Sequence, residues 1–113
     1  MLVLDSSALF SMEQLPQEES CCPPGVITEL RRYKDHRLDL WGDLLHVSEC
    51  TRESVRKVEE AARKSGDLGR LSPVDITVLA LAVDVGGTVM TDDYSIQNLS
   101  LIHISEPTRH AQI

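Results

Sequence analysis

The sequence predicts an α/β domain in which helices surround a parallel sheet. Short apolar runs, such as Leu2 to Leu4 and Thr88 to Met90, are separated by longer segments with apolar residues at helical spacing. These runs do not alternate with polar residues, which is typical of parallel strands covered on both faces. A chain of 113 residues and 12.6 kDa builds one modest hydrophobic core, so we expect a single domain.

The first third of the chain predicts a strand and two helices. Leu2 to Leu4 is a minimal buried strand, and a small-residue helix is expected from Ser7 to Met12. The polar segment from Gln14 to Pro24 contains three prolines and predicts a loop. A helix follows from Gly25 to Tyr33. Its buried side is expected at Val26, Ile27 and Leu30.

The middle of the chain predicts two more helices around a short strand. Lys34 to Leu44 has helical spacing, with Trp41 as a core anchor rather than a base-stacking platform. Leu45 to Val47 is a candidate second or third strand. Thr51 is a good cap for a helix from Arg52 to Lys64, and Asp67 to Leu71 is expected to be a loop. The inner stripe of that helix is Val55, Val58 and Ala62.

The helix that follows Ser72 has the clearest local signals. Ser72 can cap it, Pro73 suits its first turn, and Asp75 stands where a capping-box acid reaches back. Gly86 and Gly87 then end the helix. Because apolar residues surround most of it, we expect it to pack on two sides. The central strand Thr88 to Met90 would then deliver Thr91, Asp92 and Asp93 to the edge of the sheet where ligands bind.

Charge and composition restrict the class of protein. The net charge is −7 and the pI is near 4.9, which argues against unspecific affinity for nucleic acid. Ten of the eleven basic residues nevertheless lie between Arg31 and Arg70. This basic middle could hold phosphates, or it could be solvated helix faces with pairs such as Glu53 with Lys57 and Glu59 with Arg63.

Several other classes of protein are disfavoured. No apolar run approaches the ~20 residues of a membrane span, and residues 1–11 lack the pattern of a signal peptide, so a cytoplasmic location is expected. Cys21, Cys22 and Cys50 form neither a disulfide framework nor a zinc motif and are expected to be plain thiols. No P-loop or G-x-G-x-x-G is present, so we expect no nucleotide cofactor.

Carboxylates are the remaining candidates for chemistry. They are Asp5, Glu29, Asp75, Asp92 and Asp93. Clustered carboxylates repel one another and stay ionised together when a cation holds them, and their hard oxygen atoms select Mg²⁺ or Mn²⁺. Structural alternatives remain for three of them. Asp5 and Asp75 would be helix caps, and Glu29 would pair with Arg32 or Tyr33.

Four segments of the sequence carry a resemblance to a known family. They are Val3 to Ala8, Val26 to Leu30, Gly66 to Ile76 and Thr91 to Asn98. The chain resembles PIN-domain endoribonucleases, and more closely the archaeal Nob-type enzymes that mature the 3′ end of small-subunit ribosomal RNA. The first two segments are shared widely among PIN domains, whereas the last two are longer and more distinctive.

The resemblance implies a PIN-like three-layer fold and metal-dependent hydrolysis of RNA. Asp5, Glu29, Asp75 and Asp93 would be the catalytic and metal-binding acids, with Asp92 as the alternative fourth acid. Ser6 and Thr91 would orient these acids. The proposed contacts to the RNA backbone are Arg31, Arg32, Lys34 and Arg37. The implied partner is precursor ribosomal RNA of the small subunit.

The end of the sequence departs from that resemblance. The domain is expected to span residues 1–99 and to lack its last strand, because residues 100–113 resemble a translated sequencing adapter. The alternative is a divergent native tail. The competing functions are a toxin-type PIN ribonuclease and a non-catalytic module that binds RNA or ribosomes. A haloacid-dehalogenase-like phosphatase is disfavoured because Ser7 occupies the place of its second Asp.

Overall fold

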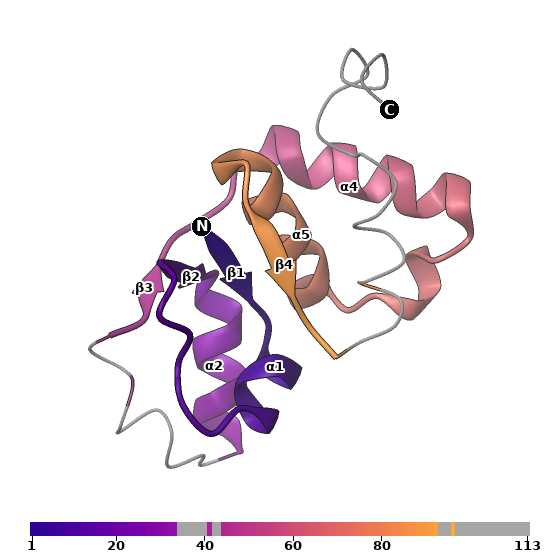
Figure 1. The fold of residues 1–113 in the computed structure, drawn as a ribbon. Coiled ribbons are helices and arrows are strands. Elements are labelled where there is room, and N and C mark those ends of the chain that lie inside the picture. Colours follow the sequence, from indigo (N-terminus) through magenta and orange to yellow (C-terminus); the bar gives the residue numbers. More distant parts are fainter. Residues whose placement is uncertain (34–40, 42–43, 93–95, 97–113) are drawn as a thin grey trace.

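Four short parallel strands form the sheet of this protein in the order β3-β2-β1-β4 (Figure 1). The strands are β1 (Leu2–Leu4), β2 (Ser20–Cys22), β3 (His46–Val47) and β4 (Thr88–Met90). The structure is a computed structural model that describes residues 1–33, 41, 44–92 and 96. The predicted α/β class with a parallel sheet flanked by helices is confirmed.

β1 lies inside the sheet and pairs on both sides, as β2 also does. Its residues Leu2 and Val3 lie opposite Ser20 and Cys21 of β2, and all three residues of β1 lie opposite β4. Val3 and Leu4 are fully buried. Since Leu4 pairs with Met90 in this parallel register, the residues that follow the two strands, Asp5 and Thr91, come out side by side.

Two of the described helices begin and end where local capping signals place them. The described helices are α1 (Ser6–Ser11), α2 (Pro24–Arg32), α4 (Arg52–Ser65), the 3₁₀ helix η1 (Leu68–Arg70) and α5 (Pro73–Val85). The Thr51 hydroxyl accepts a hydrogen bond from the Ser54 N–H, and Ser72 forms both bonds of a capping box with Asp75. Gly86 ends α5 at φ 63°, a left-handed conformation that favours glycine.

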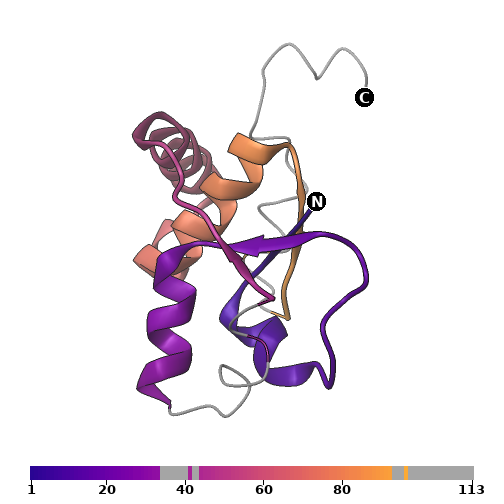
Figure 2. The ribbon, with the colours of Figure 1, turned by 90° about the vertical axis from the view of Figure 1, so that its left-hand side faces the viewer.

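α5 packs on two sides, as its nearly continuous apolar surface predicts. Val78, Leu81 and Ala82 belong to the core beneath the strands, which also contains the buried residues of β1 and α2. Leu79 and Ala80 belong to a second core against Val58 and Ala62 of α4. Figures 1 and 2 show α5 between the sheet and α4. The chain therefore needs α4 to cover the outer side of α5.

Several packing predictions are confirmed. Trp41 is buried in the core beneath the strands, as an anchor rather than an exposed platform. Val26 and Leu30 are buried on α2, and Ile27 is partly buried beside them. α2 approaches α5 closely at Gly25, where a Cβ atom would lie 2.9 Å from a methyl group of Val74. The rest of the predicted helix Lys34 to Leu44 lies largely outside the described residues.

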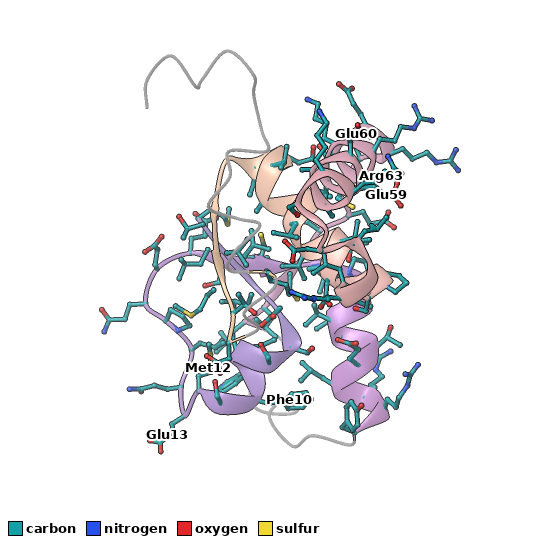
Figure 3. All side chains as sticks on the ribbon, turned by 90° about the vertical axis from the view of Figure 1, so that its right-hand side faces the viewer. Phe10, Met12, Glu13, Glu59, Glu60 and Arg63 are labelled. Atoms are coloured by element: carbon teal, nitrogen blue, oxygen red, sulfur yellow. The ribbon has the colours of Figure 1, made fainter. Side chains whose placement is uncertain are left out.

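Four local predictions differ from the structure. The predicted loop from Gln14 to Pro24 contains β2, because a run of only three residues becomes a strand through pairing with β1. β4 is the outer strand of the described sheet rather than a central one, and its Thr88 and Met90 are exposed. The predicted loop after Asp67 contains η1. Finally, Arg63 pairs with Glu60 rather than with Glu59 (Figure 3).

The cysteines are free thiols, as predicted. Burial raises the pKa of the Cys22 thiol to about 12, with a smaller contribution from Cys21, so that this thiol stays protonated near neutral pH. Within the described residues, no helix is long and apolar enough to cross a membrane.

Candidate active site

The site is built around Asp5, the residue that directly follows β1. Asp5 is only 3% exposed and serves as the N-cap of α1. One carboxylate oxygen, Oδ1, accepts hydrogen bonds from the Ala8 N–H at 2.9 Å and from the Ser7 hydroxyl at 2.8 Å. A buried carboxylate is costly unless donors meet it, and these contacts meet it at the start of a helix, where backbone N–H groups converge.

The end of β4 supplies the next donor to Asp5. The Thr91 hydroxyl donates a hydrogen bond to Oδ2 of Asp5, and it also lies 3.2 Å from the Ser7 hydroxyl. Asp92 is held beside them, because its N–H donates to the Ser7 hydroxyl and its carboxylate accepts from Ser11 at 2.7 Å. The ends of β1 and β4 are thus joined by side chains as well as by strand pairing.

Glu29 approaches the same segment from α2. Its Oε1 accepts a hydrogen bond from the Ser6 hydroxyl at 2.6 Å, and the side chain is half-buried. Within the described residues the Glu29 carboxylate bonds this serine rather than the Arg32 or Tyr33 that the sequence suggested as an alternative. The contiguous residues Asp5 to Ser7 therefore contact both Glu29 on α2 and the Thr91–Asp92 segment after β4.

A shallow hollow opens at this point of the surface. It has a volume of about 460 Å³ and is lined by Ser6, Ser7, Phe10, Glu29 and Tyr33. Its lining therefore combines hydroxyl groups and a carboxylate with two aromatic rings. Such a lining can accept a ligand that combines polar and planar apolar groups.

Asp75 has a clear local role. Its carboxylate accepts a hydrogen bond from the Ser72 N–H at 2.8 Å, and its own N–H donates to the Ser72 hydroxyl at 3.1 Å. The capping interpretation of Asp75 is confirmed by this pair of bonds. Its additional role as a metal ligand stays a prediction.

The predicted RNA contacts and the fourth acid are only partly described. Arg31 and Arg32 are exposed in the last turn of α2, which also carries Glu29. Asp93, Lys34 and Arg37 lie outside the described residues.

The chemistry of the donor atoms suits a hard divalent cation. The carboxylates of Asp5, Glu29 and Asp92 and the nearby hydroxyls all present oxygen, which is the ligand atom that Mg²⁺ and Mn²⁺ prefer. Among the residues that the structure describes, however, no three acidic, histidine or cysteine side chains gather closely enough to hold a metal ion. The proposed set includes Asp93, which directly follows Asp92.

Three side chains of this region were not singled out from the sequence. Ser7 bonds both Asp5 and the Asp92 backbone, and Ser11 bonds the Asp92 carboxylate. The two serines that follow the strand-end Asp5 are a signal in the sequence from which Ser7 could be identified. Tyr33 lines the hollow only because α2 ends beside α1, and no local pattern in the sequence indicates this.

Comparison with known proteins identifies the class of protein that this fold and site define. Residues 2–85 match the family described as "PIN domain of ribonuclease". The chain belongs to this family of ribonucleases.

Individual relatives divide between two kinds of ribonuclease. Endoribonuclease Nob1 of Archaeoglobus fulgidus is 40% identical over 106 residues, which cover 88% of this chain and 61% of the relative. Endoribonuclease Nob1 of Methanothermobacter thermautotrophicus is 38% identical over 103 residues, 85% of this chain and 60% of the relative. Ribonuclease VapC1 of Thermoplasma acidophilum is 39% identical over 100 residues, 87% of this chain and 52% of the relative. The chain thus spans 52% to 61% of the length of these relatives.

Proposed function

We propose that this chain is the nuclease domain of a metal-dependent endoribonuclease that hydrolyses an RNA phosphodiester bond. One observation carries the proposal: the segment Asp5 to Ser7 contacts Glu29 on one side and Thr91 with Asp92 on the other. Three segments far apart in the sequence thereby bring acids and their hydrogen-bond donors to one edge of a parallel sheet, where ligands bind in α/β folds.

The proposed acids are Asp5, Glu29, Asp75 and Asp93, with Asp92 as the alternative to Asp93. Together they would hold Mg²⁺ or Mn²⁺, and their all-oxygen chemistry supports this choice. When bound, such an ion would supply Lewis-acid activation of water and would neutralise charge on the scissile phosphate. Thr91 would keep the Asp5 carboxylate in position, and Ser6 would do the same for Glu29.

The proposed RNA contacts extend from the end of α2. Arg31 and Arg32 are exposed there, close in sequence to Glu29, and Lys34 and Arg37 continue the basic segment. Guanidinium and ammonium groups bind backbone phosphates and fix the register of the RNA without reading its sequence.

The proposed biological substrate is precursor RNA of the small ribosomal subunit, cleaved to mature its 3′ end. The supporting observations are the similarity to the two Nob1 enzymes and the Gly66 to Ile76 segment, which resembles that group. The second candidate function is that of a toxin-type ribonuclease, favoured by the similar identity to the VapC1 protein.

A cleavage assay with matched variants tests the hydrolysis. A short single-stranded RNA is incubated with Mn²⁺ and either the wild type, Glu29→Gln or the control Glu53→Gln, in which an exposed carboxylate on α4 is neutralised. We expect Glu29→Gln to lower the cleavage rate by more than about 100-fold, because even an outer partner of a metal ligand contributes 10- to 100-fold. Glu53→Gln should cleave like the wild type.

A second variant tests the central acid. Asp5→Asn keeps a residue that caps helices well, so α1 should still form, but it removes the charge. Metal-dependent cleavage that survives in Asp5→Asn, in protein with an unchanged circular dichroism spectrum, would refute the proposed mechanism. To distinguish ribosomal RNA maturation from the toxin-type function, cleavage at one position of a precursor-derived RNA is compared with cleavage of an unrelated RNA. Equal cutting of both favours the toxin-type alternative.

A further inference from the structure

An exposed aromatic ring stands at the rim of the candidate active site. Tyr33 directly follows α2 and is 67% exposed, and it lines the hollow together with Glu29 and Ser6. Trp41, in contrast, is buried in the core. Unlike the other large hydrophobic side chains that are exposed among the described residues, the Tyr33 ring lines the hollow beside polar groups of the candidate active site.

The Tyr33 ring is held in place rather than merely exposed. Its centroid lies 5.7 Å from that of Phe10, and the two rings meet edge to face at 82°. Phe10 packs against the core beneath the strands, so it is a firm support, and it stands on α1 near the end of α2 (Figure 3). The Tyr33 N–H donates a hydrogen bond to the Glu29 carbonyl at 3.2 Å. This bond fixes the backbone of Tyr33 to α2, the helix that carries Glu29.

The lining of the hollow matches the parts of a nucleotide. Ser6, Ser7 and Glu29 offer hydroxyl and carboxylate oxygens, whereas Phe10 and Tyr33 offer aromatic surface. The volume of about 460 Å³ falls within the range of small-ligand sites. An unpaired base can stack on an aromatic side chain, but a base inside a duplex is already stacked on its neighbours and cannot reach one.

We propose that Tyr33 is a substrate-positioning residue that stacks on an unpaired base beside the scissile phosphate. This inference rests on the proposed function and adds to it a residue that positions the RNA. Exposed arginines in the last turn of α2 stand next to Tyr33 in sequence, where they can meet the phosphates that flank the stacked base. Stacking tolerates every base, so Tyr33 selects unpaired RNA rather than a sequence.

The experiment compares three variants on one RNA. Tyr33→Ala removes the ring, Tyr33→Phe keeps it, and Leu44→Ala is the control, because it truncates a side chain that is 64% exposed and does not line the hollow. We expect Tyr33→Ala to raise KM by about 5- to 160-fold, since base stacking contributes about 1–3 kcal/mol when measured by alanine substitution. kcat should change less than KM. Tyr33→Phe and Leu44→Ala should behave like the wild type.

An abasic scan of the RNA identifies the base. At one position near the cut, removing the base should weaken binding to the wild type but not to Tyr33→Ala, because the two changes delete the same contact. A 2-aminopurine placed there should be quenched by the wild type and by Tyr33→Phe, but not by Tyr33→Ala.

Two results would overturn the inference. One is an unchanged KM in Tyr33→Ala. The other is an increased KM in Tyr33→Ala when no abasic position of the RNA weakens binding to the wild type. That result would show that the ring acts in folding or in binding another protein. Thermal unfolding of each variant identifies a folding defect. Binding and quenching are also measured in a chelator, where no cleavage is expected. RNA that is stacked by the wild type there and stays uncut after Mn²⁺ is added contradicts the proposed hydrolysis and leaves the stacking role intact.

Discussion

Replacing Thr91 with valine removes one hydroxyl from the interior of the site and keeps the shape of the side chain. That hydroxyl donates a hydrogen bond to the Asp5 carboxylate, and the two residues are only 8% and 3% exposed. Water therefore cannot easily replace the lost donor. The variant tests whether the end of β4 stabilises the carboxylate at the end of β1.

The expected loss follows from the charge and burial of the acceptor. A hydrogen bond to a charged group contributes about 1.5–3 kcal/mol to stability, and the lower end applies here because Ser7 and the Ala8 N–H still donate to Asp5. For a domain of this size, each kcal/mol lowers the Tm by about 4–8 °C. We therefore expect Thr91→Val to lower the Tm by about 6 °C or more.

The assay is urea or thermal unfolding followed by circular dichroism, with Thr28→Val as the matched control. Thr28 is exposed on α2 and its hydroxyl donates to the Pro24 carbonyl at 3.3 Å, so the same substitution there should change stability by no more than about 0.5 kcal/mol. Equal effects of the two variants would refute the reasoning. Thr91→Val should also slow cleavage by about 10- to 100-fold, as loss of an outer partner of a metal ligand does.

Two further predictions concern the scaffold. Gly87→Ala should destabilise the fold by about 1–3 kcal/mol, because the new Cβ would lie 2.6 Å from the Met1 carbonyl oxygen. The control is Gly69→Ala, in which the new Cβ meets nothing within 4 Å, so this variant should be close to neutral in the same unfolding assay. Burial alone would raise the pKa of Asp84, but hydrogen bonds from Ser54 and Thr51 lower the pKa overall. The ionised carboxylate therefore stabilises the folded state above about pH 4, and this stabilisation is lost as the pH falls below that value. Asp84→Asn should therefore be less stable than the wild type at pH 7, by under about 1 kcal/mol because the group is exposed. The difference in stability should shrink towards pH 3, and a difference that does not depend on pH would contradict this prediction.

The sequence by itself determined the helices with strong local signals. The caps at Thr51 and Ser72, the left-handed turn at Gly86 and the apolar surface of α5 all depend on residues within a few positions of one another. Such contacts can be predicted from spacing alone. The carboxylates at the ends of β1 and β4 could also be identified, because strand ends in a parallel sheet share one edge.

The tertiary structure alone decided where the short strands lie. β2 has three residues and no periodic pattern, and it exists because Ser20 and Cys21 lie opposite Leu2 and Val3 of β1. β4 has the apolar composition of a central strand, yet it is the outer strand of the described sheet. Strand order depends on which partners are present in space, and nothing in a three-residue run specifies them.

The same distinction holds for the candidate site. Residue types and motif resemblance singled out Asp5 and Glu29, but only folding shows that Ser6 joins Glu29 to the β1 end across 23 positions, and that Thr91 reaches Asp5 across 86. The contact of Tyr33 with Phe10 likewise depends on α1 and α2 ending side by side. Sequence patterns specify which groups are available, whereas the distances among them follow from long-range packing that no local segment encodes.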